Sequence, residues 1–103
     1  MSDKKLEKII EKILEVITPD KIILFGSRAK GTACDDSDYD ILVIKAGIKN
    51  KREIGKKLYR NMLGTNASVD IIVEIPEIVE QYKDSVGYIY KQILKEGKVV
   101  YAK

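Results

Sequence analysis

Histidine is absent from this 103-residue sequence, and cysteine occurs once, at Cys34. Without histidine, the chain cannot form a Ser-His or Cys-His nucleophile pair or a zinc site with imidazole ligands. A single cysteine excludes an internal disulfide and a thiolate metal cluster. Oxygen ligands are therefore the remaining way to hold a metal ion, and carboxylates suit hard cations such as Mg²⁺ or Mn²⁺.

Long apolar runs are also absent. No stretch approaches the roughly 20 apolar residues that a membrane span requires. The beginning of the chain, MSDKKLEKII, alternates charged and apolar residues, unlike a secretory signal. We therefore expect a cytoplasmic protein without a membrane segment. The length of 103 residues predicts one domain over residues 1–103, with one hydrophobic core and no second module.

A strong excess of one charge is missing as well. The net charge is +3 and the sequence pI is about 8.9, which is only mildly basic. A nucleic-acid partner is therefore not expected, although the charge does not exclude one. Basic residues gather between Lys49 and Arg60. We interpret them as a solvated helix face, with attraction of RNA or of an acidic protein as the alternative.

Helical periodicity is clear in two segments, residues 6–17 and 49–63. Apolar residues recur there at three- and four-residue spacing, which predicts two amphipathic helices. Pro76 suits the first turn of a third helix. Ser85 is a candidate cap for a fourth helix, which Gly97 is expected to close.

Short runs rich in isoleucine and valine lie between these helices. They predict strands over residues 21–25, 38–44 and 68–75, and a short edge strand over residues 99–101. Alternation of helices with short strands indicates an α/β (α+β) fold, in which helices pack on a small sheet of three to four strands.

The segment from Gly26 onward has the features of a phosphate-binding turn. Gly26 and Gly31 have the separation found in a P-loop, but Thr32 occupies the position where that motif requires lysine. The P-loop interpretation therefore fails. What remains is a strand, a Gly26-Ser27 turn and a short helix beginning near Arg28, a geometry in which backbone N–H groups and a hydroxyl can bind an anion.

Three of the aspartates that follow this turn are candidate metal ligands. Asp38 and Asp40 lie two residues apart on a predicted strand, so their carboxylates are expected on the same face. Asp70 is a third carboxylate, in an otherwise apolar strand. Two like charges so close together favour shared divalent cations, as in two-metal phosphoryl or nucleotidyl transfer, where the ions sit about 3.5–4 Å apart.

These motifs together resemble a known family. The run Gly26-Ser27, then Ser37 to Ile41 (SDYDI), then Asp70 in a following strand resembles the polymerase-β nucleotidyltransferase superfamily. Within it, GSRAKG followed by SDYDILV resembles the minimal nucleotidyltransferase (MNT) proteins of bacteria and archaea. The resemblance implies a small mixed sheet flanked by helices, the polymerase-β-like nucleotidyltransferase fold.

The resemblance also implies roles for individual residues. Asp38 and Asp40 would bind two Mg²⁺ ions, with Mn²⁺ as a substitute. Asp70 would bind the ion that activates the acceptor hydroxyl, and would be able to take the hydroxyl proton.

The donor implied by the resemblance is ATP, with release of pyrophosphate. Gly26 and Ser27 would hold the triphosphate. Arg28 and Lys30 lie beside that turn and are candidates for neutralising phosphate charge.

The acceptor is the open question. In the minimal family, the partner is typically a small helical HEPN-type toxin encoded nearby, and the chain is expected to be an antitoxin that moves AMP onto a tyrosine hydroxyl of that toxin. Two alternatives remain: a non-catalytic antitoxin that neutralises its partner by complex formation, and a nucleotidyltransferase that acts on RNA or a small molecule.

Other polar and aromatic residues have simpler interpretations. We interpret Asp35 and Asp36 as solvated loop residues, Cys34 as incidental and Glu74 as a strand-end residue, with a place in the site as the alternative for Glu74. Three tyrosines near the end of the chain are either partner contacts or partly buried residues of the core: Tyr88, Tyr90 and Tyr101.

Overall fold

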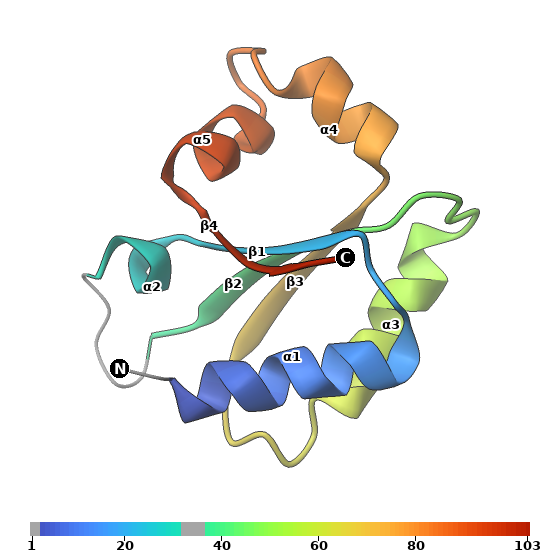
Figure 1. Cartoon of the computed structure of the whole chain (residues 1–103), viewed down its shortest axis with the longest axis vertical. Coiled ribbons are helices and arrows are strands. Elements are labelled where there is room, and N and C mark those ends of the chain that lie inside the picture. Colours follow the sequence, from blue (N-terminus) through green and yellow to red (C-terminus); the bar gives the residue numbers. More distant parts are fainter. Residues whose placement is uncertain (1–2, 32–36) are drawn as a thin grey trace.

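A four-stranded mixed sheet forms the middle layer of the computed structural model, which describes residues 3–31 and 37–103. Helices α1 and α3 cover one face of the sheet, and α4 and α5 cover the other (Figure 1). The helices are α1 (Lys4–Val16), α2 (Ser27–Lys30), α3 (Lys51–Asn61), α4 (Pro76–Tyr82) and α5 (Ile89–Glu96). The strands are β1 (Lys21–Phe25), β2 (Tyr39–Ile44), β3 (Val69–Glu74) and β4 (Lys98–Ala102). The prediction of a small α/β sheet flanked by helices is confirmed.

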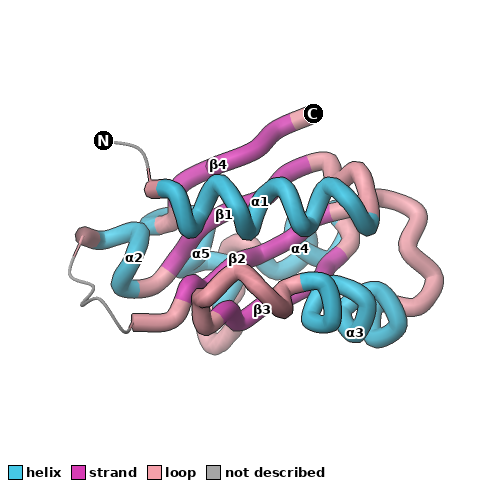
Figure 2. The backbone as a smooth tube through the Cα atoms, turned by 90° about the horizontal axis from the view of Figure 1, so that it is seen from below, coloured by secondary structure: helices cyan, strands magenta, loops and turns pink. Residues whose placement is uncertain are grey.

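The strand order is β3-β2-β1-β4. Strand β1 pairs antiparallel with both β2 and β4, whereas β2 and β3 are parallel and joined through α3. Figure 2 shows the strands side by side behind α1 and α3. The end of β1 and the beginnings of β2 and β3 therefore lie at the same end of the sheet.

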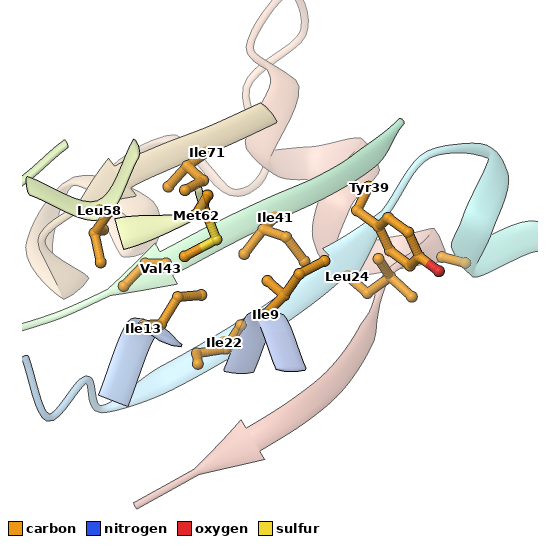
Figure 3. Close-up of a cluster of buried hydrophobic side chains, with 11 residues drawn as sticks. Ile9, Ile13, Ile22, Leu24, Tyr39, Ile41, Val43, Leu58, Met62 and Ile71 are labelled. Carbon is orange, nitrogen blue, oxygen red and sulfur yellow. The ribbon is translucent and has the colours of Figure 1, made fainter. Parts of the chain in front are cut away.

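The face of the sheet that α1 and α3 cover holds the larger core. Ile9 and Ile13 of α1 are fully buried there against Ile41 and Val43 of β2 (Figure 3). Leu58 of α3 completes this contact. Burial of such a side chain stabilises the fold by about 1.5–3 kcal/mol, so this layer fixes the position of β2.

The opposite face is covered by α4 and α5. Val79 of α4 and Ile93 of α5 pack on Leu42 and Ile44 of β2. Strand β2 is thus buried on both faces, with odd-numbered residues toward α1 and even-numbered residues toward α5. This alternation decides which side chains of β2 can reach a site on either face.

Glu74 is a buried acid at the far end of β3, with 5% of its surface exposed. Its carboxylate accepts hydrogen bonds from Tyr90 Oη at 2.6 Å, from Lys51 Nζ at 2.7 Å and from the Ile75 backbone N–H at 3.1 Å. Burial favours the neutral acid, but these donors outweigh it and hold the pKa of Glu74 below its usual range. Burial of Tyr90 and its hydrogen bond to Glu74 raise the pKa of the Tyr90 hydroxyl.

The outer edge of β3 is contacted by a tyrosine from α3. The Tyr59 hydroxyl accepts a hydrogen bond from the backbone N–H of Ile71 at 2.8 Å and donates to its carbonyl at 3.5 Å. A side chain thus satisfies backbone groups of the edge strand that no neighbouring strand reaches.

Most element boundaries differ from the sequence predictions by one or two residues, and the start of the last helix differs for a different reason. Ser85 does not cap the last helix, because α5 begins at Ile89 with Tyr88 as the capping residue and no side-chain cap. Packing decides this boundary, since the Tyr88 ring stacks on Tyr82 at 4.2 Å between centroids. Strand β2 begins at Tyr39, one residue later than predicted.

Further predictions concern residues Cys34 to Asp36, the end of the last helix and the tyrosines near the end of the chain. The candidates Cys34, Asp35 and Asp36 lie outside the described residues. Gly97 ends α5, as predicted. The two other tyrosines near the chain end lie in the core, Tyr90 buried and Tyr101 partly buried. Within the described residues, no helix is long and apolar enough to cross a membrane.

The close packing at Gly97 predicts a large effect of an added methyl group. A Cβ at Gly97 would collide with the Ile93 carbonyl and with Ile23 Cγ2, whereas a Cβ at Gly55 in α3 meets no atom within 4 Å. We expect Gly97→Ala to lower the free energy of unfolding by about 1–3 kcal/mol through overpacking. Gly55→Ala is the control and should raise it by about 0.5–1 kcal/mol, because alanine favours the helix. Urea denaturation measures both changes, and equal effects of the two substitutions would contradict the packing.

Candidate active site

Two aspartates lie in register on neighbouring parallel strands. Asp40 of β2 is paired with Asp70 of β3 on one side and with Phe25 of β1 on the other. By alternation, Asp40 shares the face of Leu42, and Asp70 shares that of Ile72, so both carboxylates lie on the face covered by α5. The sheet therefore brings two of the predicted carboxylates together near the beginnings of β2 and β3.

Gly26 lies directly against Asp40. Its backbone has φ +73° and ψ −156°, a conformation essentially reserved for glycine. A Cβ at this position would overlap the Asp40 Oδ2 atom. The absent side chain is thus what leaves room for the carboxylate, and it brings the Gly26-Ser27 turn beside Asp40.

The electrostatics of Asp40 are unfavourable in the absence of a cation. Burial, followed by the negative charges of Asp70 and Asp38, raises the pKa of Asp40 above its usual range. Hydrogen bonds from the described residues contribute nothing to offset this effect. The site therefore holds a partly buried carboxylate that lacks the donors that satisfy Glu74.

Asp38 precedes β2 by one residue and is exposed. Its backbone position is set by neighbours: the Arg28 side chain donates to the Ser37 carbonyl from Nη2 at 2.9 Å and from Nε at 3.3 Å, and Tyr39 N–H donates to the Ser68 carbonyl at 2.8 Å. These bonds fix the chain on both sides of Asp38. Its charge acts on Asp40, so the third predicted carboxylate also belongs to this edge.

Arg28 contacts the other face of the sheet. Its guanidinium lies over the Tyr39 ring, 4.2 Å from the centroid, and the Tyr39 hydroxyl donates to the Asp3 carboxylate at 2.8 Å. Tyr39 belongs to the core under α1, opposite to Asp40. In the structure, Arg28 thus holds the backbone at Ser37, just before Asp38. The predicted contact of Arg28 with a phosphate stays a prediction.

Lys30 lies at the end of α2 and forms an ion pair with Glu96 of α5, with 3.0 Å between Nζ and Oε2. Gln92 donates to the same Oε2 atom at 3.2 Å. The Lys30 hydrogen bond, followed by that of Gln92, lowers the pKa of Glu96. Both partners of the ion pair are partly exposed, so the pair contributes little to stability, but it joins α2 to α5 beside the carboxylates.

A cavity of about 230 Å³ adjoins these groups. Phe25, Gly26 and Asp40 form its strand side. Its helix side is formed by α5, through Ile89, Gln92, Ile93 and Glu96. The sequence analysis missed these residues of α5. Their spacing of three and four marks a single helix face on which polar and apolar residues mix, which was the available signal.

The donor set fits a hard divalent cation. Within residues 3–31 and 37–103, no group of three or more carboxylates is close enough to form a ready-made metal site. Mg²⁺ is usually bound by one or two carboxylates together with substrate phosphates, and oxygen ligands of this kind are what Asp40 and Asp70 offer. Glu74 is not part of this donor set, because it lies at the other end of β3 and both of its carboxylate oxygens already accept hydrogen bonds. These residues therefore suit a metal that arrives with a phosphate ligand.

Several solved structures have the fold of this chain. A putative nucleotidyltransferase from Sulfolobus solfataricus gives a TM-score of 0.67 at 25% identity, covering 97% of this chain and 79% of its own. A toxin-antitoxin structure with AMP-PNP gives 0.62 at 25% identity, covering 94% and 73%. A mutant form of the toxin-antitoxin MntA-HpeT gives 0.62 at 23% identity with the same coverage, and it shows the fold alone. The fold is that of nucleotidyltransferases.

The family follows from the sequence match. The model of the polymerase beta nucleotidyltransferase family matches residues 5–103, and the chain belongs to this family. A curated relative from Methanocaldococcus jannaschii, named "Putative protein adenylyltransferase MJ1305", is 35% identical over 69 residues, or 61% of this chain. The match spans 47% of that relative, about half its length.

The contact between Gly26 and Asp40 predicts a selective effect on ligand binding. Gly26→Ala should displace the Asp40 carboxylate and weaken Mg²⁺-ATP binding by roughly 10–100-fold, the usual cost of disturbing a metal ligand. Gly31→Ala is the control, because Gly31 also has a positive φ of +77° but its Cβ would meet no atom within 4 Å. Both variants should lose stability, yet only the first should lose affinity in calorimetric titration. A similar loss of affinity in both would contradict this role of Gly26.

The raised pKa of Asp40 predicts that its charge destabilises the fold. A carboxyl whose folded-state pKa is raised binds its proton more tightly in the folded state, so the penalty is absent below about pH 4 and grows as pH rises through the pKa of Asp40. Asp40→Asn should therefore unfold at higher urea concentration than the unsubstituted protein at pH 7, and at the same concentration in acid. Asp84→Asn removes an exposed charge and serves as the control. A destabilised Asp40→Asn at pH 7 would overturn this account.

Proposed function

We propose that this protein is a metal-dependent nucleotidyltransferase that moves AMP from ATP to a hydroxyl group, with a tyrosine of a partner toxin as the acceptor. One observation carries the proposal: Asp40 lies in register with Asp70 and directly against the Gly26-Ser27 turn. Carboxylates that would hold a metal and a turn that would bind phosphates thus lie at the same end of the sheet, where β1 ends and β2 and β3 begin. Membership in the nucleotidyltransferase family supports the same chemistry.

The proposed roles follow the positions of the residues. Asp38, Asp40 and Asp70 would hold Mg²⁺, or Mn²⁺ in its place, and the bound metal would supply positive charge to the phosphates and to the acceptor oxygen. The Gly26-Ser27 turn receives the triphosphate, because glycine allows close approach of its backbone N–H groups. Lys30 ends the short helix that follows the turn and is a further candidate for neutralising phosphate charge, although its ammonium group is paired with Glu96.

The reaction exchanges one bond at phosphorus and moves one proton. The acceptor oxygen bonds to the α-phosphorus of ATP, the bond between that phosphorus and the oxygen bridging to the β-phosphorus breaks, and pyrophosphate leaves. Asp70 is exposed at the strand edge and takes the proton of the acceptor hydroxyl. Asp40 is held more deeply and positions the reacting groups.

The acceptor assignment rests on the relatives. A similar solved structure is a toxin-antitoxin with AMP-PNP, and the curated relative is named for protein adenylylation. These names support a toxin as partner and AMP transfer to a protein, and the resemblance to minimal nucleotidyltransferases adds the proposal that the toxin is of the HEPN type and that its acceptor is a tyrosine. A non-catalytic antitoxin and a transferase for RNA or a small molecule are the competing functions that the following experiment separates.

The test uses ATP labelled at the α-phosphate, Mg²⁺ and the product of the adjacent gene. Transfer of AMP predicts label on the partner protein, no label from ATP labelled at the γ-phosphate, and loss of labelling with EDTA. Asp38→Asn and Asp40→Asn should each reduce labelling by at least about 10³-fold, because the ligands of the metal are removed. Mass spectrometry then identifies the modified residue.

Asp84→Asn provides the matched control, since it removes an exposed aspartate charge outside the strand edge. It should label the partner like the unsubstituted protein. Inhibition of the partner that survives Asp40→Asn would show neutralisation by complex formation. Label on RNA or on a small molecule, with none on the partner, would replace the acceptor assignment.

A further inference from the structure

Helix α5 forms the wall of the cavity that faces Asp40. Its residues 89, 92, 93 and 96 line this space, and Phe25 of β1 lies across from them. Because positions three and four apart share one helix face, α5 offers two apolar and two polar side chains to the same ligand. Ile93 is buried, whereas Ile89 is 45% exposed and accessible to a ligand.

The cavity has the size of part of a nucleotide. Its volume of about 230 Å³ is below the roughly 300–1,000 Å³ of sites that enclose a whole drug-sized ligand. The Gly26 side of this space is taken by the phosphates in the proposed function. The side formed by α5 is therefore left for the nucleoside, which combines an apolar ring face with polar hydroxyl groups.

Glu96 is the acceptor best placed for those hydroxyls. Its contacts with Lys30 Nζ at 3.0 Å and Gln92 Nε2 at 3.2 Å both involve Oε2. Within the described residues, neither contact uses Oε1, which keeps its lone pairs for another donor. Two neighbours thus hold the carboxylate in place from one side while the other oxygen remains an acceptor at the cavity wall.

We propose that Glu96 accepts a hydrogen bond from the ribose 2′-hydroxyl of the donor, so that α5 selects ribonucleotides over 2′-deoxyribonucleotides. This inference rests on the proposed function, because it takes the ligand of the cavity to be the donor nucleotide. Gln92 and Lys30 are positioning residues for the carboxylate. A carboxylate that accepts from a ribose hydroxyl forms a charge-assisted bond, one of the stronger kinds of hydrogen bond.

The test compares binding of Mg²⁺-ATP with binding of Mg²⁺-2′-deoxy-ATP by calorimetry, with no acceptor present. The unsubstituted protein should prefer ATP by about tenfold, the size expected for one hydrogen bond to a charged group. In Glu96→Ala, the preference should fall to less than about twofold. The ratio is the readout, because release of Lys30 in this variant changes the affinity for both nucleotides alike.

Glu11→Ala is the matched control, since it removes an exposed glutamate from α1 on the opposite face of the sheet. It should keep the tenfold preference. Equal affinities for the two nucleotides in the unsubstituted protein, or a preference that survives Glu96→Ala, would overturn the role of Glu96 while leaving the proposed transfer intact. Absence of nucleotide binding would overturn both, whereas selective binding without transfer to any acceptor would refute the proposed function alone.

Discussion

The parallel register that sets Asp40 beside Asp70 is the constraint on which the site depends. The parallel register of β2 and β3 sets the two carboxylates opposite each other, and the glycine at the end of β1 lets Asp40 remain partly buried there. The large core under α1 and α3 supplies the stability that holds these strands in that register. The fold thus keeps a partly buried carboxylate beside a second one, and a cation with its phosphate ligands would neutralise their charge.

The two ends of β3 show how two acidic residues on one strand gain different roles. Glu74 and Asp70 lie on one face of the strand, four residues apart. Glu74 is buried among a lysine, a tyrosine and a backbone N–H, which satisfy its charge and tie α3 and α5 to the sheet. Asp70 is exposed at the open end. Available donors, more than the acid itself, decide which carboxylate is structural and which is free to bind a ligand.

Local patterns explain what could be predicted from the sequence. The places of Gly26, Asp40 and Asp70 at strand ends were predictable because local spacing and strand alternation determine them, whereas the binding roles of these residues stay predictions. Burial of Glu74 and the cavity wall of α5 were not readable, since both depend on packing between segments far apart in the chain. The position of the Arg28 side chain was not predictable either, because its guanidinium lies over the ring of Tyr39, on the face of the sheet covered by α1. Ser85 failed as a cap because stacked tyrosines set the start of α5.

The tyrosine at the edge of β3 has a consequence for association. Edge strands present backbone donors and acceptors that invite pairing with a strand of another molecule. The hydroxyl of Tyr59 occupies both groups of Ile71, near the middle of this edge, and so replaces the contacts that an added strand would make. One phenol group on a neighbouring helix thereby disfavours growth of the sheet into an aggregate along the edge that carries Asp70.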